Sequence, residues 1–222
     1  MYSPAAARLI APGQAVGVDL SGPMLARARA DAEAAGLGNA VFQQDDAQAH
    51  SFEPARFDLV ISRFGIMFFA DPIAGFANIG RALRPAGRLI VVCWQEPARN
   101  PWLMVPATAA LAHVPVPDLG APGAPGPFSL ADPDRINGVL TGAGLGQIGT
   151  TPLVAPLKLG RDAADAVNFI AGTGLARTLL DQAEPSTARR ALEAVADALH
   201  PYQTPGGVLL DGAAWLVTAT RP

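Results

Sequence analysis

The chain has little of several residue types, and each shortage excludes a class of protein. It holds one cysteine, Cys93, among 222 residues, which excludes an internal disulfide and a thiolate metal cluster. The three histidines, His50, His113 and His200, stand far apart in the sequence and show no spacing typical of metal ligands. We therefore expect no metal site, and we expect Cys93 to be a small buried side chain.

Long apolar runs and a basic surface are also missing. The apolar runs fall far short of the ~20 residues that span a bilayer, so no membrane span is expected. The chain opens without the charged and apolar regions of a secretory signal. The net charge is −3 with scattered arginines, which disfavours a nucleic-acid partner. Half of the residues are hydrophobic, which predicts a packed core and, by default, a cytoplasmic enzyme.

Strand-like and helix-like segments alternate through the first hundred residues. Short apolar runs typical of strands lie at 15–20, 40–44, 57–62 and 89–94. Helical spacing fills 23–35 and the segment behind Asp71-Pro72, a pair that typically opens a helix. Strands that alternate with helices indicate βαβ units and a mostly parallel sheet. The predicted fold class is therefore α/β.

The pattern also predicts which residues of two segments are buried. The helix behind Asp71 carries its apolar residues on one face, namely Ile73, Phe76, Gly80 and Leu83. The residues 84–87, with proline and glycine, are predicted to stop this helix. The run at 89–94 is apolar at every position, which predicts a strand covered on both faces.

The composition changes after residue 96. The proline-rich residues 97–130 predict a lid beside the ligand end of the sheet, with a short helix at 102–112; a loose surface excursion is the alternative. The remainder, 131–222, predicts helices behind Asp132-Pro133 and at 162–170 and 185–199, and strands at 147–159 and 208–220. With no repeat and no long linker, we predict one domain over 1–222, in which residues 1–96 bind the cofactor.

Several short motifs in the first part follow one another in a specific order. They are Gly17-Val18-Asp19-Leu20-Ser21 with Met24-Leu25 and Ala28-Arg29, then Asp45-Asp46-Ala47, Phe57-Asp58-Leu59-Val60 and Leu83-Arg84-Pro85-Ala86-Gly87-Arg88-Leu89. Together they resemble the class I S-adenosylmethionine-dependent methyltransferases, in particular the branch with the ubiquinone and menaquinone biosynthesis enzymes. The resemblance is dense over 8–96 and loose beyond. It implies a Rossmann-like three-layer fold and methyl transfer from S-adenosylmethionine to a small, partly hydrophobic molecule.

The resemblance implies roles for the residues around the first motif. Asp19 would accept hydrogen bonds from the two ribose hydroxyls of the cofactor, a role that suits an ionised carboxylate with several lone pairs. Leu20 and Met24 would pack beside the adenine. A structural alternative for Asp19 is that it caps the helix that begins near Ser21.

The later motifs imply the rest of the cofactor site. Asp46 would accept from the adenine amino group, and the backbone N–H of Ala47 would bind a ring nitrogen. Ser62 and Arg63 follow the fourth family strand, where backbone groups hold the methionine end. Alternatives stay open, because Asp46 is also a plausible turn acid and Asp45 stands beside it. The aromatic side chains of Phe64, Phe68 and Phe69 would form either the wall near the methyl group or part of the core.

One part of the family pattern has no counterpart ahead of Gly17. The family places a first strand and a glycine-rich loop about thirty residues upstream, as a βαβ unit requires, and sixteen residues precede Gly17. Residues 1–13 resemble the end of the helix that follows that loop. In the family this strand lies between the strands that end here at Asp19 and Ser62. We consider three alternatives: the natural protein starts upstream of Met1, the two flanking strands pair directly, or another chain supplies the strand.

The reaction class needs few catalytic side chains. Displacement at a sulfonium methyl group mainly requires that donor and acceptor are positioned and water is excluded, and the sequence assigns no catalytic residue. His113 in the lid is a candidate general base or a solvated histidine. Two other functions stay open: a truncated or non-catalytic interaction module, and a nicotinamide-dependent enzyme. The expected partners are a small-molecule acceptor and a second copy of the chain in a homodimer. Residues 144–149 spell G-x-G-x-x-G, but a helix precedes them and a strand follows, the reverse of a dinucleotide fingerprint.

Overall fold

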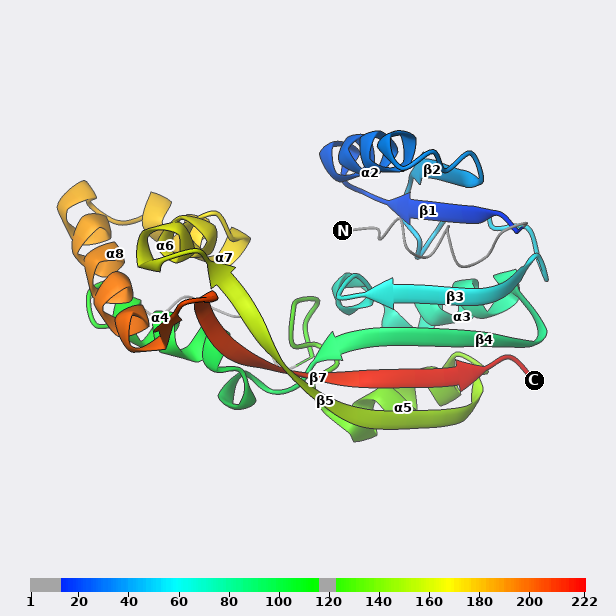
Figure 1. Cartoon of the computed structure of the whole chain (residues 1–222). Coiled ribbons are helices and arrows are strands. Elements are labelled where there is room, and N and C mark those ends of the chain that lie inside the picture. Colours follow the sequence, from blue (N-terminus) through cyan, green and yellow to red (C-terminus); the bar gives the residue numbers. More distant parts are fainter. Residues whose placement is uncertain (1–12, 116–122) are drawn as a thin grey trace. The chain divides into compact units, whose positions relative to one another are not determined.

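The computed structural model describes residues 13–115 and 123–222, and the elements follow the predicted alternation (Figure 1). The first part contains β1 (Ala15–Asp19), α2 (Gly22–Ala34), β2 (Ala40–Gln44), β3 (Phe57–Arg63), the 3-10 turn η1 (Ile66–Phe68), α3 (Pro72–Ala82) and β4 (Leu83–Trp94). The second part contains η2 (Pro97–Arg99), α4 (Pro101–Leu111), α5 (Pro133–Gly142), β5 (Gly146–Gly160), α6 (Ala163–Ala171), α7 (Gly174–Asp181), α8 (Pro185–Leu199), η3 (His200–Tyr202), β6 (Gln203–Thr204) and β7 (Gly207–Thr220). The predicted continuation of a helix over residues 1–13 falls almost entirely outside the described residues.

The strands form two sheets. β1 and β2 pair in parallel, and β3, β4, β7 and β5 follow one another in a second sheet, to which β6 adds by pairing antiparallel with β7. In the described chain β1 and β3 are therefore not hydrogen-bonded neighbours, so direct pairing of these two strands, one of our three alternatives, is wrong. Every residue of β1 is half-buried.

The described chain divides into two compact units. Unit 1 combines residues 13–91, 137–149 and 218–222; unit 2 combines 92–136, apart from the gap, and 150–217. The division passes through β4, α5, β5 and β7, each of which contributes residues to both units. The single-domain organisation stays a prediction.

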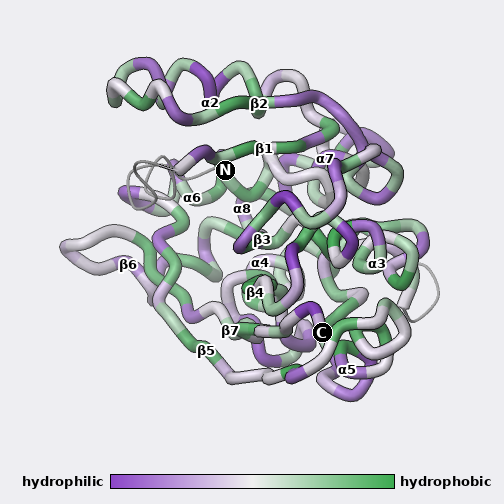
Figure 2. The backbone as a smooth tube through the Cα atoms, turned by 90° about the vertical axis from the view of Figure 1, so that its right-hand side faces the viewer, coloured by the Kyte–Doolittle hydropathy of each residue, from purple (hydrophilic) through white to green (hydrophobic). Residues whose placement is uncertain are grey.

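Local signals start the helices as predicted. The Ser21 hydroxyl accepts a hydrogen bond from the Met24 N–H at 3.3 Å, and Asp71 Oδ1 accepts from the Ala74 N–H at 3.0 Å. A proline follows each cap within the first turn, where its missing N–H costs nothing. Figure 2 shows the result of the apolar spacing: β1 is largely hydrophobic, whereas α2 alternates between hydrophobic and hydrophilic residues.

The predicted buried face of α3 is partly wrong. Phe76 and Gly80 are buried, as predicted, but the Ile73 side chain is 45% exposed. Asn78, a polar residue, lies in the buried face instead and is 4% exposed. Its hydrogen bonds to a distant loop, described below, account for its burial.

Strand β4 differs from the prediction at its start and on one face. It begins at Leu83, directly after α3, because the C-terminal end of the chain pairs with it: the N–H of Ala86 donates to the Arg221 carbonyl, and the Arg221 N–H donates to that of Gly87, both at 2.9 Å. The strand alternates between buried and half-buried residues from Leu89 to Trp94. It is therefore fully covered on one face only.

Unit 2 has an apolar core of its own. Its buried residues are Leu159, Ala166, Val195, Leu199, Val208 and Leu210. Partly buried side chains of α4 and α6 pack against this cluster. Helix α8 packs its apolar face against this core and keeps its other face polar. Helix α7, which begins at Gly174, is the one α-helix of the described chain that the sequence did not predict.

Candidate functional site

The carboxyl ends of β1 and β2 lie side by side in unit 1. The two strands run in register from Ala15 opposite Ala40 to Asp19 opposite Gln44. Beyond that pair, the Asp45 N–H donates to the Asp19 carbonyl at 3.1 Å, and the Gln44 side-chain amide donates to the Leu20 carbonyl at 3.0 Å. The structure therefore brings the first two motifs together, although 25 positions separate Asp19 from Gln44.

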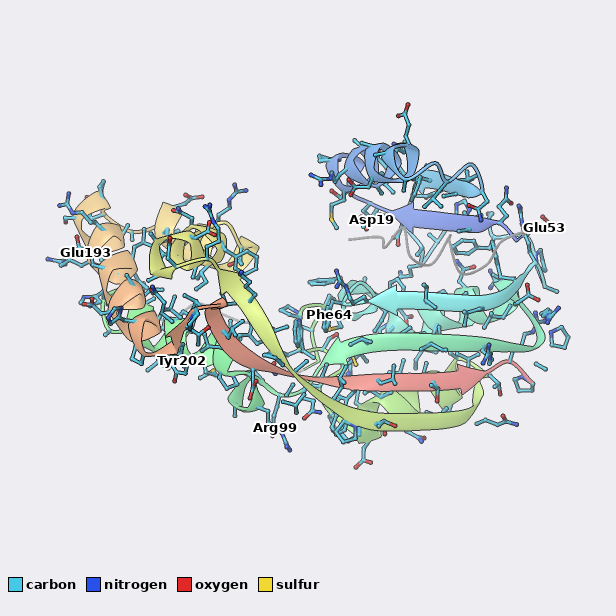
Figure 3. The ribbon with its side chains drawn as sticks, viewed as in Figure 1. Asp19, Glu53, Phe64, Arg99, Glu193 and Tyr202 are labelled. Atoms are coloured by element: carbon cyan, nitrogen blue, oxygen red, sulfur yellow. The ribbon has the colours of Figure 1, made fainter. Side chains whose placement is uncertain are left out.

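Asp19 stands at the tip of β1. Figure 3 shows it at the arrowhead of the strand, at the same end of unit 1 as Phe64 beyond β3. Its Oδ1 accepts a hydrogen bond from the Ser21 N–H at 2.8 Å, and its side chain is half-buried. Leu20 is 68% exposed and Met24 43% exposed. An acid with two exposed apolar side chains beside it fits a ribose and an adjoining apolar ring.

The loop after β2 contains both candidate adenine acids. Asp45 Oδ2 lies 2.7 Å from Nδ1 of His50, and this hydrogen bond, with that from the Asp46 N–H, lowers the pKa of Asp45. Asp46 Oδ1 accepts from the Gln48 N–H at 2.9 Å, and its carbonyl accepts from the His50 N–H at 2.7 Å. Asp45 is thus engaged by His50, which favours Asp46 as the ligand-facing acid of the pair.

The carboxyl end of β3 carries Ser62, which is half-buried, and Arg63, which is exposed. Phe64 follows with φ of 60°, a left-handed conformation that is a genuine outlier for an aromatic residue and is typical of functional sites. Phe69 lies edge-to-face with Phe76, with ring centroids 5.8 Å apart. Its ring therefore belongs to the packing of α3, the structural alternative of the prediction.

Sequence reasoning missed three residues around this loop. They are His50, which binds Asp45; Asn78, which binds the loop from α3; and Arg81, which binds Asn78. Only a buried polar residue on an otherwise apolar helix face could have marked Asn78 in the sequence. Its partners are 28 and 31 positions away, so the spacing gives no local signal.

The predicted lid residues lie in unit 2. Trp102 of α4 packs against the core of that unit, and its indole Nε1 donates to the Asn100 Oδ1 at 3.0 Å. Trp94 lies at 5.0 Å from Trp102, measured between ring centroids. His113 follows α4 and is exposed. The glycine-rich residues 144–149 follow α5 and lead into β5, as predicted for a helix end.

Two negative findings apply to the described residues alone. No helix there is both long and apolar enough to cross a membrane. Within 13–115 and 123–222, no group of three or more histidine, cysteine, aspartate or glutamate side chains is arranged to hold a metal ion. The site in unit 1 thus consists of carboxylates, backbone groups and apolar side chains.

The first part of the chain is similar in sequence to known proteins. Residues 2–87 match a protein family described as a methyltransferase domain. A demethylmenaquinone methyltransferase of Thermus thermophilus is 41% identical over 96 residues, which cover 43% of this chain and 43% of that protein. The chain thus spans less than half the length of this curated relative. These matches cover less than half of the chain, and they support the resemblance of residues 2–87 to the class I S-adenosylmethionine-dependent methyltransferases.

Solved structures extend the similarity of fold over nearly the whole chain. The YcgJ protein of Bacillus subtilis superimposes with a TM-score of 0.56 at 16% identity, covering 94% of this chain and 82% of that one. Phosphoethanolamine N-methyltransferase 2 of Haemonchus contortus, solved with phosphomonomethylethanolamine and S-adenosylhomocysteine, has a TM-score of 0.53 at 18% identity and covers 95% and 44%. The predicted α/β, Rossmann-like methyltransferase fold is confirmed. A second structure of the Haemonchus contortus enzyme was solved with S-adenosyl-L-methionine.

Proposed function

We propose that the chain transfers the methyl group of S-adenosylmethionine to a small, partly hydrophobic acceptor. The observation that carries the proposal is the union of two motifs at one edge: Asp19 and the Asp45–His50 loop are joined by the hydrogen bond from the Asp45 N–H to the Asp19 carbonyl. The demethylmenaquinone methyltransferase among the relatives supports an apolar acceptor.

The proposed binding roles follow from the chemistry of each group. Asp19 accepts from the ribose hydroxyls, and the exposed Leu20 and Met24 cover the adenine. Asp46 accepts from the adenine amino group while the Ala47 N–H donates to a ring nitrogen. These contacts bind the nucleoside half, and they leave the reactive sulfur end to other groups.

Ser62 and Arg63, at the end of β3, complete the proposed site on the methionine side. The polar groups of this turn suit the amino and carboxylate ends of an amino acid. When bound, the cofactor supplies a methyl group on a sulfonium, whose C–S electron pair stays on sulfur as the bond to the acceptor forms. The protein contributes position and exclusion of water. His113 is our candidate for taking up the acceptor proton.

Isothermal calorimetry with S-adenosylhomocysteine tests the first step. We expect saturable one-to-one binding, and then transfer of labelled methyl groups to members of a panel of hydroxylated aromatic and prenylated compounds. A non-catalytic interaction module is the second candidate, favoured by the separation of β1 and β2 from the second sheet among the described strands. Absence of binding heat would favour the module, whereas binding without transfer to any acceptor would leave a cofactor-binding module.

A further inference from the structure

One buried side chain, that of Asn78, holds the loop on the proposed adenine side of the candidate site. Asn78, in the middle of α3, is 4% exposed. Its amide nitrogen donates one hydrogen bond to the Ala47 carbonyl and one to the His50 carbonyl, both at 2.9 Å. A side-chain amide has two hydrogens to donate, and Asn78 donates both to carbonyls of the loop that follows β2.

The orientation of this amide is fixed by a cation. The guanidinium of Arg81, one turn further along α3, donates to Asn78 Oδ1 at 2.6 Å. A rotated amide would place its oxygen against two carbonyl oxygens and its nitrogen against a cation. Both contacts would be repulsive, so the hydrogen-bond network leaves one orientation.

The anchored Ala47 carbonyl directly follows the groups assigned to the adenine, the Asp46 carboxylate and the Ala47 N–H. The loop is closed within itself by the His50 N–H on the Asp46 carbonyl and by the Gln48 N–H on Asp46 Oδ1. The Asn78 bonds then tie both ends of the stretch 47–50 to α3. With the Ala47 peptide held on its carbonyl side, the direction of the neighbouring peptide groups is limited.

We infer that Asn78 is a positioning residue for recognition of a 6-aminopurine, through Asp46 and Ala47. The inference rests on the proposed function, because it takes the loop after β2 as the adenine contact. Asn78 does not touch the cofactor in this assignment. It sets the geometry in which an acceptor and a donor face the amino group and the adjacent ring nitrogen, an arrangement that a purine with a 6-carbonyl group cannot satisfy.

The second anchor of the loop is weaker and lies on the surface. The Gln48 side-chain oxygen accepts from the Asp71 N–H at 3.0 Å, in the turn that caps α3. This contact is exposed, so water can replace it at little cost. The two Asn78 contacts are part-buried and come from a side chain that is 4% exposed, so water replaces them less readily. Asn78 is therefore the anchor on which the loop geometry depends.

The test is a comparison of two ligands across variants. S-adenosylhomocysteine and its 6-oxo analogue, S-inosylhomocysteine, are titrated by calorimetry into the unaltered chain, Asn78→Asp and the control Asn137→Asp on exposed α5 surface. Asn78→Asp keeps the side-chain shape and replaces two donors by acceptors. We expect its affinity for S-adenosylhomocysteine to fall about tenfold, with the preference for the adenine ligand reduced toward one.

A purely structural role would give a different pattern. If Asn78 only stabilised the fold, Asn78→Asp would lower the unfolding midpoint and weaken both ligands alike, with the preference unchanged; that outcome overturns the inference. Arg81→Met is the second variant, since Arg81 is exposed and its loss spares the core. It should reduce the preference in the same direction. Should the unaltered chain bind neither ligand, the proposed function falls and this inference falls with it.

Discussion

The carboxylate of Asp19 accepts a hydrogen bond from the Ser21 N–H at 2.8 Å, and the Ser21 hydroxyl in turn accepts from the first turn of α2. The acid at the end of β1 thus also closes the turn into the following helix. The N-cap of α2 is Ser21, and Asp19 accepts from the N–H of that cap residue instead of capping the helix itself. The contact with Ser21 needs an acceptor oxygen, whereas the proposed ribose role requires the negative charge as well.

The substitution Asp19→Asn separates these two roles. The amide keeps an acceptor oxygen for the Ser21 N–H, so the turn should persist and the unfolding midpoint should change little. The charge is lost, and a charge-assisted hydrogen bond contributes roughly 1.5–3 kcal/mol. We expect the affinity for S-adenosylhomocysteine, measured by calorimetry, to fall at least about tenfold.

A matched control for Asp19→Asn is Asp31→Asn on α2. Asp31 forms an exposed ion pair with Arg27 at 2.8 Å, and such pairs contribute little. This control should bind the ligand as the unaltered chain does. Equal affinities for Asp19→Asn and the unaltered chain would remove Asp19 from the site.

The free energy of unfolding at acidic pH should depend on Asp45. The hydrogen bond from His50 lowers its folded pKa below the ordinary value of 3.8. A lowered folded pKa stabilises the fold at pH values above the unfolded pKa, and this contribution is lost as the pH falls through the folded pKa. Asp45→Asn should therefore be less stable than the unaltered chain at neutral pH, and the difference should close below pH 3.8, as urea unfolding would measure.

Asp165 provides the comparison in unit 2. Hydrogen bonds from the Arg161 side chain and backbone lower the pKa of Asp165, which is the same direction as for Asp45. Asp165→Asn should show the same loss of acid-dependent stability. It should leave the binding of S-adenosylhomocysteine unchanged, whereas Asp45→Asn should weaken it through the loop. Equal effects of both variants on binding would contradict a local role for Asp45.

Local order was predictable where local signals decide it. β2 has the predicted bounds, β1 and β3 differ from them by one residue at one end, and α2 differs by one residue at each end. An apolar run bounded by turn residues, or a serine or aspartate before a proline, contains the information for such elements within a few positions. Of the four residues at helical spacing in the segment 23–35, Leu25, Ala28 and Ala32 are buried and Ala35 is half-buried.

Features set by distant partners were not predictable in this way. β4 begins at Leu83 because Arg221 pairs with Ala86 and Gly87, more than a hundred positions away. Asn78 is buried because two carbonyls of another loop need donors. In the candidate site, the sequence therefore predicted the residues at strand ends but not the network that holds them. Propensity and spacing describe a segment, whereas these contacts depend on the fold.

Asn100 should be the polar side chain on which unit 2 depends most. It is fully buried, donates to the carbonyls of Gln95 and Glu96, and accepts from Trp102 Nε1 and from the Ala213 N–H. Asn100→Ala leaves these partners without a bond in a buried place, and each unsatisfied group costs roughly 1–3 kcal/mol. We expect urea unfolding to show a loss of at least about 3 kcal/mol.

The control for Asn100→Ala is Asn168→Ala on α6, an exposed asparagine of the same unit. Its effect should stay within about 0.5 kcal/mol. The comparison is decided by the unfolding free energies of the two variants. If Asn100→Ala lost as little unfolding free energy as the control, water would have to bind the groups that the substitution leaves unpaired.

One glycine of α3 makes room for an aromatic ring beside the candidate site. A Cβ on Gly75 would lie 2.6 Å from Cδ2 of Phe69 and 2.9 Å from its Cγ, closer than side-chain atoms approach. Gly75→Ala must displace the Phe69 ring from its edge-to-face contact with Phe76. Overpacking costs roughly 1–3 kcal/mol, more than the ~0.5–1 kcal/mol that alanine gains over glycine in a helix. The free energy of unfolding should therefore fall.

The same substitution on α5 should have the opposite sign. Gly138 is exposed, and a Cβ there would meet nothing within 4 Å. Only the backbone term remains, so Gly138→Ala should raise the free energy of unfolding by about 0.5–1 kcal/mol in urea titrations. Both glycines are helical residues of unit 1, so the pair differs mainly in what surrounds the new methyl group. A gain at both positions would show that Phe69 moves aside freely, and its packing against α3 would then not hold the turn after β3 in place.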